Sequence, residues 1–226
     1  ITVVYAREHF TADQTANKTI INVNEDNRVI DVLTKPKMAG ELSASLNIFV
    51  IGRKFLIDLA AEAASRSLYS FEVDVLQHRI KELDIMGYKY EGDYEQVDSA
   101  EAYYRANMKL LEQPLRRSLF NPETPIYTKI RDEAPAKHGI DAICKNSIVA
   151  DGCIIEGEVE NSILFRGVHI GKGAKVKDSI IMQGTHIGKK CEVRYTITDK
   201  EVEIADYRVL TGSQSYPIFI EKRAQV

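Results

Sequence analysis

The sequence predicts an α/β segment followed by a parallel β-helix, and two observations support this fold class. The first is an internal repeat: residues 162–176 and 179–193 are identical at eight of fifteen positions after a shift of seventeen residues. The second is the alternation of strand-like and helix-like stretches over residues 1–112. We therefore expect a mixed domain first and a β-helix in the last third of the chain.

The repeated segments are expected to form the central coils of the β-helix. A coil of three short strands takes about eighteen residues, so a shift of seventeen indicates one shortened corner. Isoleucine, valine and leucine are expected to point inward, and glycine to occupy corners. Residues 147–157 predict a weaker first coil, residues 196–204 a last one, and residues 207–226 a segment that covers the open end.

The composition argues against several classes of function. The chain has 226 residues, a net charge of −3, and neither an apolar run of membrane-spanning length nor a secretory signal pattern. This charge does not favour nucleic acid or an anionic membrane as a partner. The three cysteines are odd in number and lack the C-x-x-C spacing of a zinc site, so we expect reduced thiols in a cytoplasmic protein.

The first fifty residues are predicted to be mostly β. Residues 1–5 form a strand with no methionine before them, which favours a piece of a longer protein over a terminal edge strand. Residues 19–23 and 28–33 are strand-like and flank a polar turn. After an irregular stretch at 35–40, residues 45–51 predict a buried strand.

The next sixty residues are predicted to be mostly helical. In the first helix, an apolar stripe repeats at four-residue spacing, with Leu56 beside it. The stripe consists of Phe55, Leu59 and Ala63. A second helix is indicated by further apolar residues at helical spacing. These are Val73, Leu76, Ile80 and Leu83.

A third helix is predicted from Asp98 to about Glu112. Asp98 and Glu101 have the spacing of a capping box, and Pro114 is expected to end the helix. The inner stripe of this helix consists of Tyr103, Ala106 and Leu110. Four of the six prolines lie in the irregular stretch that follows, which is typical of a connection between domains. We therefore predict two domains, residues 1–120 and residues 121–226.

The stacked histidines are one candidate for chemistry. His169 and His186 occupy equivalent positions of the repeat, so they are expected to lie one above the other. A histidine on a β-helix could serve as the general base of a hexapeptide-repeat acyltransferase. The competing interpretation is a duplicated outward polar residue, because neither histidine has a carboxylate nearby in the sequence to orient it.

Lys35 is the other candidate, since a lysine held by the following Pro36 could present its ammonium group to a phosphate. Asp98 could line a pocket near a helix start, but helix capping explains it better. The sequence contains no glycine-rich phosphate loop, no H-E-x-x-H motif and no G-x-S-x-G motif.

The order of these features resembles the sugar-nucleotide pyrophosphorylases, and most of all glucose-1-phosphate adenylyltransferase. The most specific stretches are EAYYRANMKLL at 101–111 and NPETPIYTKIRDEAPAK at 121–137, and the resemblance covers essentially the whole chain. It implies the C-terminal portion of a nucleotidyltransferase domain (GT-A, Rossmann-like), followed by a left-handed parallel β-helix of hexapeptide repeats. The family's N-terminal half, with its G-x-G-x-R-L nucleotide loop, has no counterpart in this sequence.

The resemblance also implies a sugar-phosphate site that is degenerate here. Lys35, Ser45 and Phe71 match family residues that bind the sugar phosphate. The family's glutamate before the lysine is Thr34, and its sugar-binding aspartate is Ser70.

The family's aspartate that helps hold the catalytic Mg²⁺ is replaced by Gln96. A neutral amide in place of a carboxylate weakens a site that must hold Mg²⁺ beside a triphosphate. The resemblance therefore points to the non-catalytic, regulatory subunit type (GlgD type), with no catalytic residue, metal or cofactor in this chain and Mg²⁺ confined to the family's active site.

The implied function is regulation of ADP-glucose synthesis from ATP and glucose-1-phosphate for glycogen biosynthesis. The implied partner is a catalytic adenylyltransferase subunit or a second copy of the chain, in a tetramer, with a small-molecule effector. Two alternatives remain at this point: a hexapeptide-repeat acyltransferase, and a sibling enzyme such as a mannose-1-phosphate guanylyltransferase.

Overall fold

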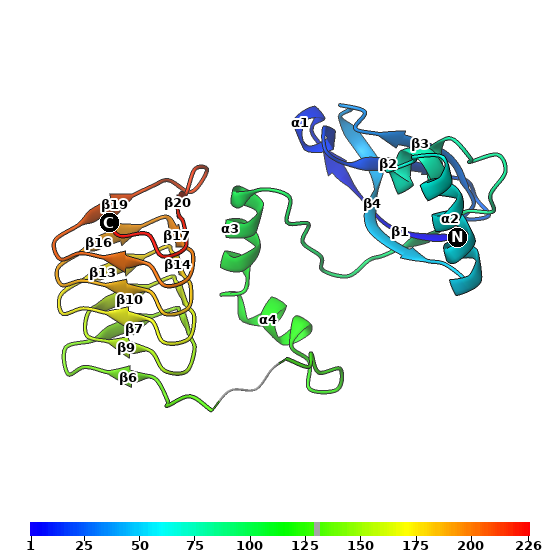
Figure 1. Ribbon diagram of the computed structural model, residues 1–226. Coiled ribbons are helices and arrows are strands. Elements are labelled where there is room, and N and C mark those ends of the chain that lie inside the picture. The colour runs from blue at the N-terminus through cyan, green and yellow to red at the C-terminus, as the bar shows by residue number, and fades with distance from the viewer. Residues whose placement is uncertain (129–131) are drawn as a thin grey trace. The chain divides into compact units, whose positions relative to one another are not determined.

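The computed structural model describes residues 1–128 and 132–226 and divides into two compact units, Ile1–Asp93 and Tyr94–Val226 (Figure 1). Residues 129–131, which belong to the family-like run at 121–137, lie outside the described residues.

The first unit is built on one mixed sheet of five strands in the order β3-β2-β4-β1-β5. The strands are β1 (Thr2–Phe10), β2 (Thr19–Val23), β3 (Val29–Thr34), β4 (Gly40–Val50) and β5 (Met86–Lys89). β1 runs antiparallel to β4 and parallel to β5. It is therefore an internal strand, and the alternative of a terminal edge strand is wrong because β5 returns to pair with it.

The predicted hairpin between β2 and β3 is confirmed, and its turn has a clear local cause. The side-chain carbonyl of Asn24 accepts hydrogen bonds from the backbone N–H groups of Asp26 and Arg28. Asn27 adopts the left-handed conformation with a φ of 60°, which asparagine tolerates better than most residues. The irregular stretch before β4 is also confirmed, and β4 starts five residues earlier than predicted, at Gly40.

The first unit contains three helical segments, of which α2 and η1 contribute to its core. They are α1 (Ala12–Thr15), α2 (Arg53–Ser65) and the π-helical segment η1 (Phe71–Gln77). The predicted stripe of α2 is wrong for Phe55 and Leu56, which are 41% and 44% exposed, because α2 turns only Leu59 into the core. The second predicted helix is confirmed in place, with Leu76 fully buried, but it has π-helical geometry.

The second unit begins with two helices, α3 (Ala100–Lys109) and α4 (Gln113–Leu119). The cap of α3 is Ser99, whose hydroxyl accepts the Ala102 N–H, so the prediction of Asp98 as the cap is wrong by one residue. The prediction that Pro114 ends this helix is wrong: α3 ends at Lys109, and Pro114 lies in the first turn of α4, where its missing N–H costs nothing.

The compact units also divide the chain earlier than the predicted boundary after residue 120. The reason is that α3 packs on the β-helix, where Tyr104 shares a buried cluster with Ile180 and Ile197.

Fifteen short strands then form the β-helix, as three parallel sheets of five strands each. The first sheet contains β6 (Lys137–His138), β9 (Ile154–Ile155), β12 (His169–Ile170), β15 (His186–Ile187) and β18 (Glu203–Ile204). The second contains β7 (Ile143–Lys145), β10 (Glu158–Glu160), β13 (Lys175–Lys177), β16 (Glu192–Arg194) and β19 (Val209–Thr211). The third contains β8 (Ile148–Val149), β11 (Ile163–Leu164), β14 (Ile180–Ile181), β17 (Thr196–Thr198) and β20 (Ile218–Ile220).

The register of these strands confirms the seventeen-residue repeat. Ile170 pairs with Ile187, and Ile163 pairs with Ile180, each at a separation of seventeen. The coil before them is shorter, because Ile163 pairs with Ile148 at a separation of fifteen. The difference arises at one corner, where two residues join β9 to β10 but four join β12 to β13.

Each corner of the β-helix places a residue in the left-handed conformation at equivalent positions of successive coils. One corner uses Asn146, Asn161, Asp178 and Tyr195. A second uses Gly152, Gly167, Gly184 and Glu201, and a third uses Gly173, Lys190 and Tyr207. Glycine and asparagine adopt this conformation with the least strain, which explains their frequency at the corners.

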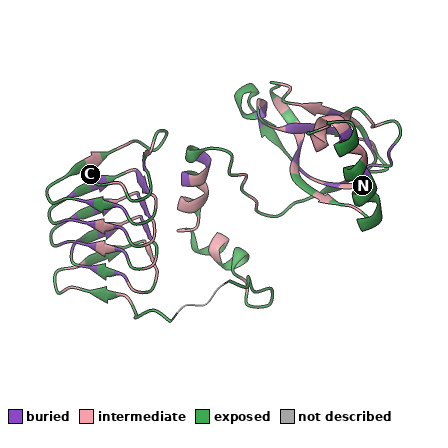
Figure 2. Ribbon diagram, in the orientation of Figure 1, coloured by how far each residue is buried: buried purple, intermediate pink, exposed green. Residues whose placement is uncertain are grey.

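Apolar side chains from successive coils fill the β-helix, and Figure 2 shows buried residues recurring along its coils. The largest fully buried ones include Ile155, Leu164, Ile170, Ile181, Ile187 and Ile204. Residues 207–226 do more than cover the open end: they supply β19 and β20, which pair with β16 and β17. The prediction of a simple cover is corrected accordingly.

We expect Gly157→Ala to destabilise the second unit. An added Cβ would lie 2.3 Å from the carbonyl oxygen of Ala174 and 2.9 Å from that of Gly171, both in the next coil. Since backbone atoms cannot move aside cheaply, the free energy of unfolding should fall by about 1–3 kcal/mol. Chemical denaturation with far-UV circular dichroism measures this difference.

The matched control is Gly139→Ala, where the nearest atoms to an added Cβ are 3.4 Å away. Its unfolding midpoint should stay close to that of the wild type. Equal midpoints for the two variants would contradict the close approach at the Gly157 corner.

Candidate functional site

Lys35 lies directly after β3, with a φ of 51° and an exposed side chain. Its backbone N–H donates to the Lys18 carbonyl at 2.8 Å, which fixes the turn. The ammonium group is thus presented to solvent from a backbone that is held in place. This is compatible with the predicted role in phosphate binding, which stays a prediction.

Ser45 lies in the middle of β4 and is 1% exposed. Its hydroxyl accepts a hydrogen bond from the Asn47 N–H at 3.2 Å, where the strand register shifts against β1 and Asn47 has a φ of 57°. Within the first unit, Ser45 therefore supports an irregularity of β4. Its matched role in sugar binding stays a prediction.

Phe71 starts η1 and packs against β4. Its ring centroid lies 5.0 Å from that of Phe49, at an interplanar angle of 60°. Between Lys35, Ser45 and Phe71, no hydrogen bond or ion pair is found in the part of the chain that the structure describes. The structure brings Phe71 to the strand that carries Ser45, and it places Lys35 on a separate loop.

Thr34 and Ser70 have local structural roles. The Thr34 hydroxyl donates to the side-chain carbonyl of Gln77 at 3.1 Å, which ties β3 to η1. The Ser70 hydroxyl accepts the Val73 N–H at 3.2 Å, while the Ser70 N–H donates to Asp74 at 2.9 Å. Ser70 thereby stabilises the start of η1, and Thr34 holds its flank to β3. The sequence pattern did not predict these contacts.

A small cavity of about 190 Å³ opens beside the same helix. It lies between α2 and the segment 68–75 and is lined mainly by apolar side chains, among them Leu59, Ala63 and Leu68. Asp74 is one of its few polar groups, and its carboxylate already accepts the N–H groups of Tyr69 and Ser70. The cavity has no free charged group with which to hold a phosphate.

His169 and His186 stack as predicted, with ring centroids 4.7 Å apart on adjacent strands. The expectation that no carboxylate orients them is wrong. Glu156 lies 3.4 Å from His169 and Glu203 lies 3.3 Å from His186, because neighbouring coils bring together residues that are far apart in the sequence.

A largely buried polar contact joins α3 to the β-helix. Tyr104 is 4% exposed, and its hydroxyl donates to the Asp178 carbonyl at 2.8 Å. Its ring meets that of Tyr195 edge-on, with centroids 6.4 Å apart. The predicted stripe of α3 missed this residue, because the face of α3 that packs on the β-helix carries Ala102 and Tyr104.

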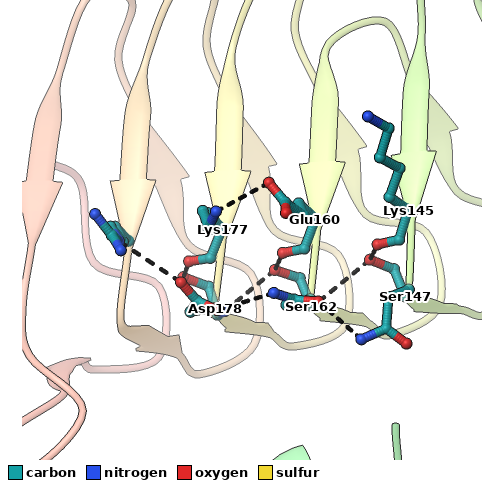
Figure 3. Close-up of polar contacts among 10 residues, drawn as sticks. Lys145, Ser147, Glu160, Ser162, Lys177 and Asp178 are labelled. Carbon is teal, nitrogen blue, oxygen red and sulfur yellow. Dashed lines mark hydrogen bonds and ion pairs between the residues drawn. The ribbon is translucent and has the colours of Figure 1, made fainter.

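The corner beneath this junction carries a ladder of hydroxyl groups. The Ser162 hydroxyl donates to the Glu160 carbonyl at 2.7 Å and accepts the Ser179 N–H of the next coil at 3.1 Å. Ser147 makes the equivalent pair of contacts one coil earlier, as Figure 3 shows. The ladder satisfies buried backbone groups that the turn would leave unpaired.

Charged side chains follow the outside of the same corner (Figure 3). Lys177 pairs with Glu160 at 3.0 Å, and Arg194 lies 3.6 Å from Asp178. The Asp178 carboxylate also accepts from the Asn161 amide at 3.4 Å. This corner thus combines a buried ladder with an outer row of charge pairs, next to the residue that Tyr104 contacts.

The comparisons with known proteins agree with this architecture. Residues 132–214 match the family model described as GlmU-like, C-terminal hexapeptide. The chain is 43% identical over 178 residues to the glycogen biosynthesis protein GlgD of Bacillus subtilis, which covers 79% of this chain and 52% of that protein.

Two further relatives extend the pattern. Identity to the GlgD protein of Geobacillus stearothermophilus is 42% over 132 residues, covering 58% of this chain and 38% of that protein. Identity to the glucose-1-phosphate adenylyltransferase of Halalkalibacterium halodurans is 32% over 162 residues, covering 70% of this chain and 42% of that protein. The resemblance to the GlgD type of the adenylyltransferase family is confirmed. The match to this chain spans about half the length of the Bacillus subtilis protein, and less than half of the other two relatives.

The family's Mg²⁺ does not fit the residues found here. The resemblance places Gln96 where the family has its metal-binding aspartate, and a neutral amide oxygen is a weaker ligand for Mg²⁺ than a carboxylate. Over residues 1–128 and 132–226, no group of three or more histidine, cysteine, aspartate or glutamate side chains could hold a metal ion. The expectation of no cofactor in this chain stays a prediction.

Membrane insertion through a helix finds no support in the described part of the chain. None of its helices combines the length and the apolar composition that a bilayer crossing requires.

We expect Tyr104→Phe to lower the free energy of unfolding of the second unit by about 1 kcal/mol, because the Asp178 carbonyl loses its hydrogen bond. Burial raises the pKa of Tyr104 above its usual value. The folded state therefore holds the phenol proton more tightly, and wild-type stability should fall as pH rises above about 10, where the unfolded tyrosine ionises. Denaturation between pH 7 and 11 measures both effects.

The variant should lose less stability than the wild type over the alkaline range. Tyr127→Phe is the matched control, since Tyr127 is 91% exposed and should change neither the midpoint nor its pH dependence. An unchanged alkaline slope in Tyr104→Phe would contradict a proton-linked role for the junction.

Proposed function

We propose that this chain is part of a non-catalytic, regulatory subunit related to glucose-1-phosphate adenylyltransferase and that it acts in glycogen biosynthesis. The observation that carries the proposal is the higher identity to two GlgD proteins, 43% and 42%, than to the Halalkalibacterium adenylyltransferase, 32%. The reaction to be regulated is the formation of ADP-glucose and pyrophosphate from ATP and glucose-1-phosphate.

Two contacts in the first unit support loss of catalysis. Where the family has a glutamate before the lysine, Thr34 is hydrogen-bonded to Gln77. Where the family has a sugar-binding aspartate, Ser70 caps η1. Neither hydroxyl carries the charge with which a carboxylate would bind sugar hydroxyl groups strongly. Both positions therefore serve the fold of this chain.

Gln96 supports the same proposal from the chemistry of phosphoryl transfer. The reaction concentrates negative charge on the phosphates, and catalysis depends on neutralising that charge with metal ions. A glutamine at the metal position removes one negative charge that would hold the ion. Without a well-held Mg²⁺, the chain would bind partners and ligands without accelerating the chemical step.

The proposed partner is a catalytic adenylyltransferase subunit, or a second copy of the chain, in a tetramer. The β-helix offers three parallel sheets for such contacts. The outward-facing positions of its strands carry both acidic and basic side chains. A small-molecule effector would act on the assembly. The cytoplasm is the proposed location, consistent with three cysteines that form no disulfide among the described residues.

The test is an assay of ADP-glucose synthesis with the protein expressed from its full reading frame. Alone, with ATP, glucose-1-phosphate and Mg²⁺, it should form no ADP-glucose above background. Mixed with a catalytic adenylyltransferase subunit from the same organism, it should co-elute on size exclusion and change the rate or the effector response. Measurable synthesis by the protein alone would refute the non-catalytic role.

Substitutions refine this test. Gln96→Asp alone should leave the protein inactive, because Thr34 and Ser70 also depart from the family pattern. The triple variant Thr34→Glu, Ser70→Asp and Gln96→Asp is the informative comparison. If Gln96→Asp alone restored synthesis, the other two positions would have no part in the loss of activity.

A further inference from the structure

The outer face of the first β-helix sheet brings two imidazole rings together. His169 on β12 and His186 on β15 are direct partners in the parallel register. Their side chains are 33% and 42% exposed, so both are open to solvent while resting on a rigid backbone. Their ring centroids are 4.7 Å apart, close to the spacing of neighbouring strands.

Each ring has one nitrogen next to a carboxylate and one nitrogen without such a contact. Nε2 of His169 faces Glu156 at 3.4 Å, which leaves its Nδ1. Nδ1 of His186 faces Glu203 at 3.3 Å, which leaves its Nε2. Histidines that bind metals commonly donate their other ring N–H to a carboxylate, which sets the tautomer and makes the free nitrogen a better ligand. Both histidines have this arrangement.

We propose that His169 and His186 form a two-imidazole binding site for a late first-row divalent transition-metal ion. The metal–nitrogen bond is about 2.0–2.1 Å, so two nitrogens on one ion lie about 3–4 Å apart. The two rings lie on directly paired strands with centroids 4.7 Å apart, which places them close to that separation. Glu156 and Glu203 orient the rings and add negative charge near the cation, and water completes the coordination shell.

The chemistry of the ligands selects the ion. Imidazole suits Cu²⁺, Ni²⁺ and Zn²⁺, whereas Mg²⁺ prefers oxygen ligands. The site is therefore distinct from the family's Mg²⁺ position at Gln96 and departs from the expectation of no metal in this chain. The described residues contain no group of three or more side chains that could hold a metal ion, and the proposed site has only two protein ligands.

Binding would connect two coils of the β-helix. β12 and β15 belong to successive coils, and an ion held by both strands stabilises the folded state relative to an unfolded chain that cannot present the pair. The site does not depend on the proposed regulatory function, because it involves no substrate and no partner subunit.

The experiment uses the untagged full chain and Ni²⁺ as the probe, with calorimetric titration and thermal unfolding. We expect one Ni²⁺ per chain and a rise in the unfolding temperature that Mg²⁺ does not produce. His169→Ala and His186→Ala should each weaken binding by at least about tenfold, and the double variant no further, because either loss removes chelation. Glu156→Gln and Glu203→Gln should weaken binding about tenfold.

His78→Ala is the matched control, since His78 is also exposed, with a side-chain exposure of 66%, and lies in the other unit. It should retain wild-type affinity and the Ni²⁺-dependent rise in unfolding temperature. His169→Asn provides a second variant if the alanine variant misfolds, which circular dichroism without metal would reveal. Binding that survives in both single histidine variants, or binding lost in His78→Ala, would overturn the proposal.

Discussion

The parallel register between successive coils is the constraint on which the second unit depends. Each strand pairs with its counterpart seventeen residues later over the central coils, so chemically equivalent residues stack directly on each other. Stacked isoleucines such as Ile170 and Ile187 exclude water from the interior, and their burial supplies most of the driving force for the fold. The same register stacks whatever lies outside, which is why His169 and His186 meet.

Stacking is possible only if the chain turns in the same way at every coil. The corners achieve this with left-handed residues at equivalent positions, and the hydroxyl groups beside one corner satisfy the backbone groups that the turn leaves over. This corner also binds α3, since Tyr104 donates to the carbonyl of the corner residue Asp178. The helix and the β-helix are thereby parts of one compact unit.

The first unit has no repeated register and is stabilised by contacts between its helices and its sheet. Its core packs side chains of α2 and η1, such as Leu59 and Leu76, against strand residues such as Val3, and Phe71 packs on Phe49 beside this core. Polar residues near this contact, Thr34 and Ser70, are hydrogen-bonded within the unit. These hydrogen bonds join both side chains to η1. Thr34 and Ser70, which depart from the family pattern, thus take part in the fold of this chain.

The sequence by itself determined the fold class, the β-helix and its coil length, the β2–β3 hairpin and the stacking of the two histidines. All of these depend on local turn chemistry or on a repeat, and both are written in short stretches of sequence. Residues carried over from the resemblance, Lys35, Ser45 and Phe71, could be named from the sequence but not placed relative to each other.

Only the tertiary structure decided the contacts between distant segments. It made β1 an internal strand, moved the cap of α3 from Asp98 to Ser99, and brought Glu156 and Glu203 to the histidines. The pairing of β1 and the contacts of the histidines depend on partners supplied by another strand or coil, whereas the cap of α3 is a local contact between Ser99 and Ala102. Sequence periodicity reports which side of an element is apolar, but it carries no information on which neighbour will meet that side.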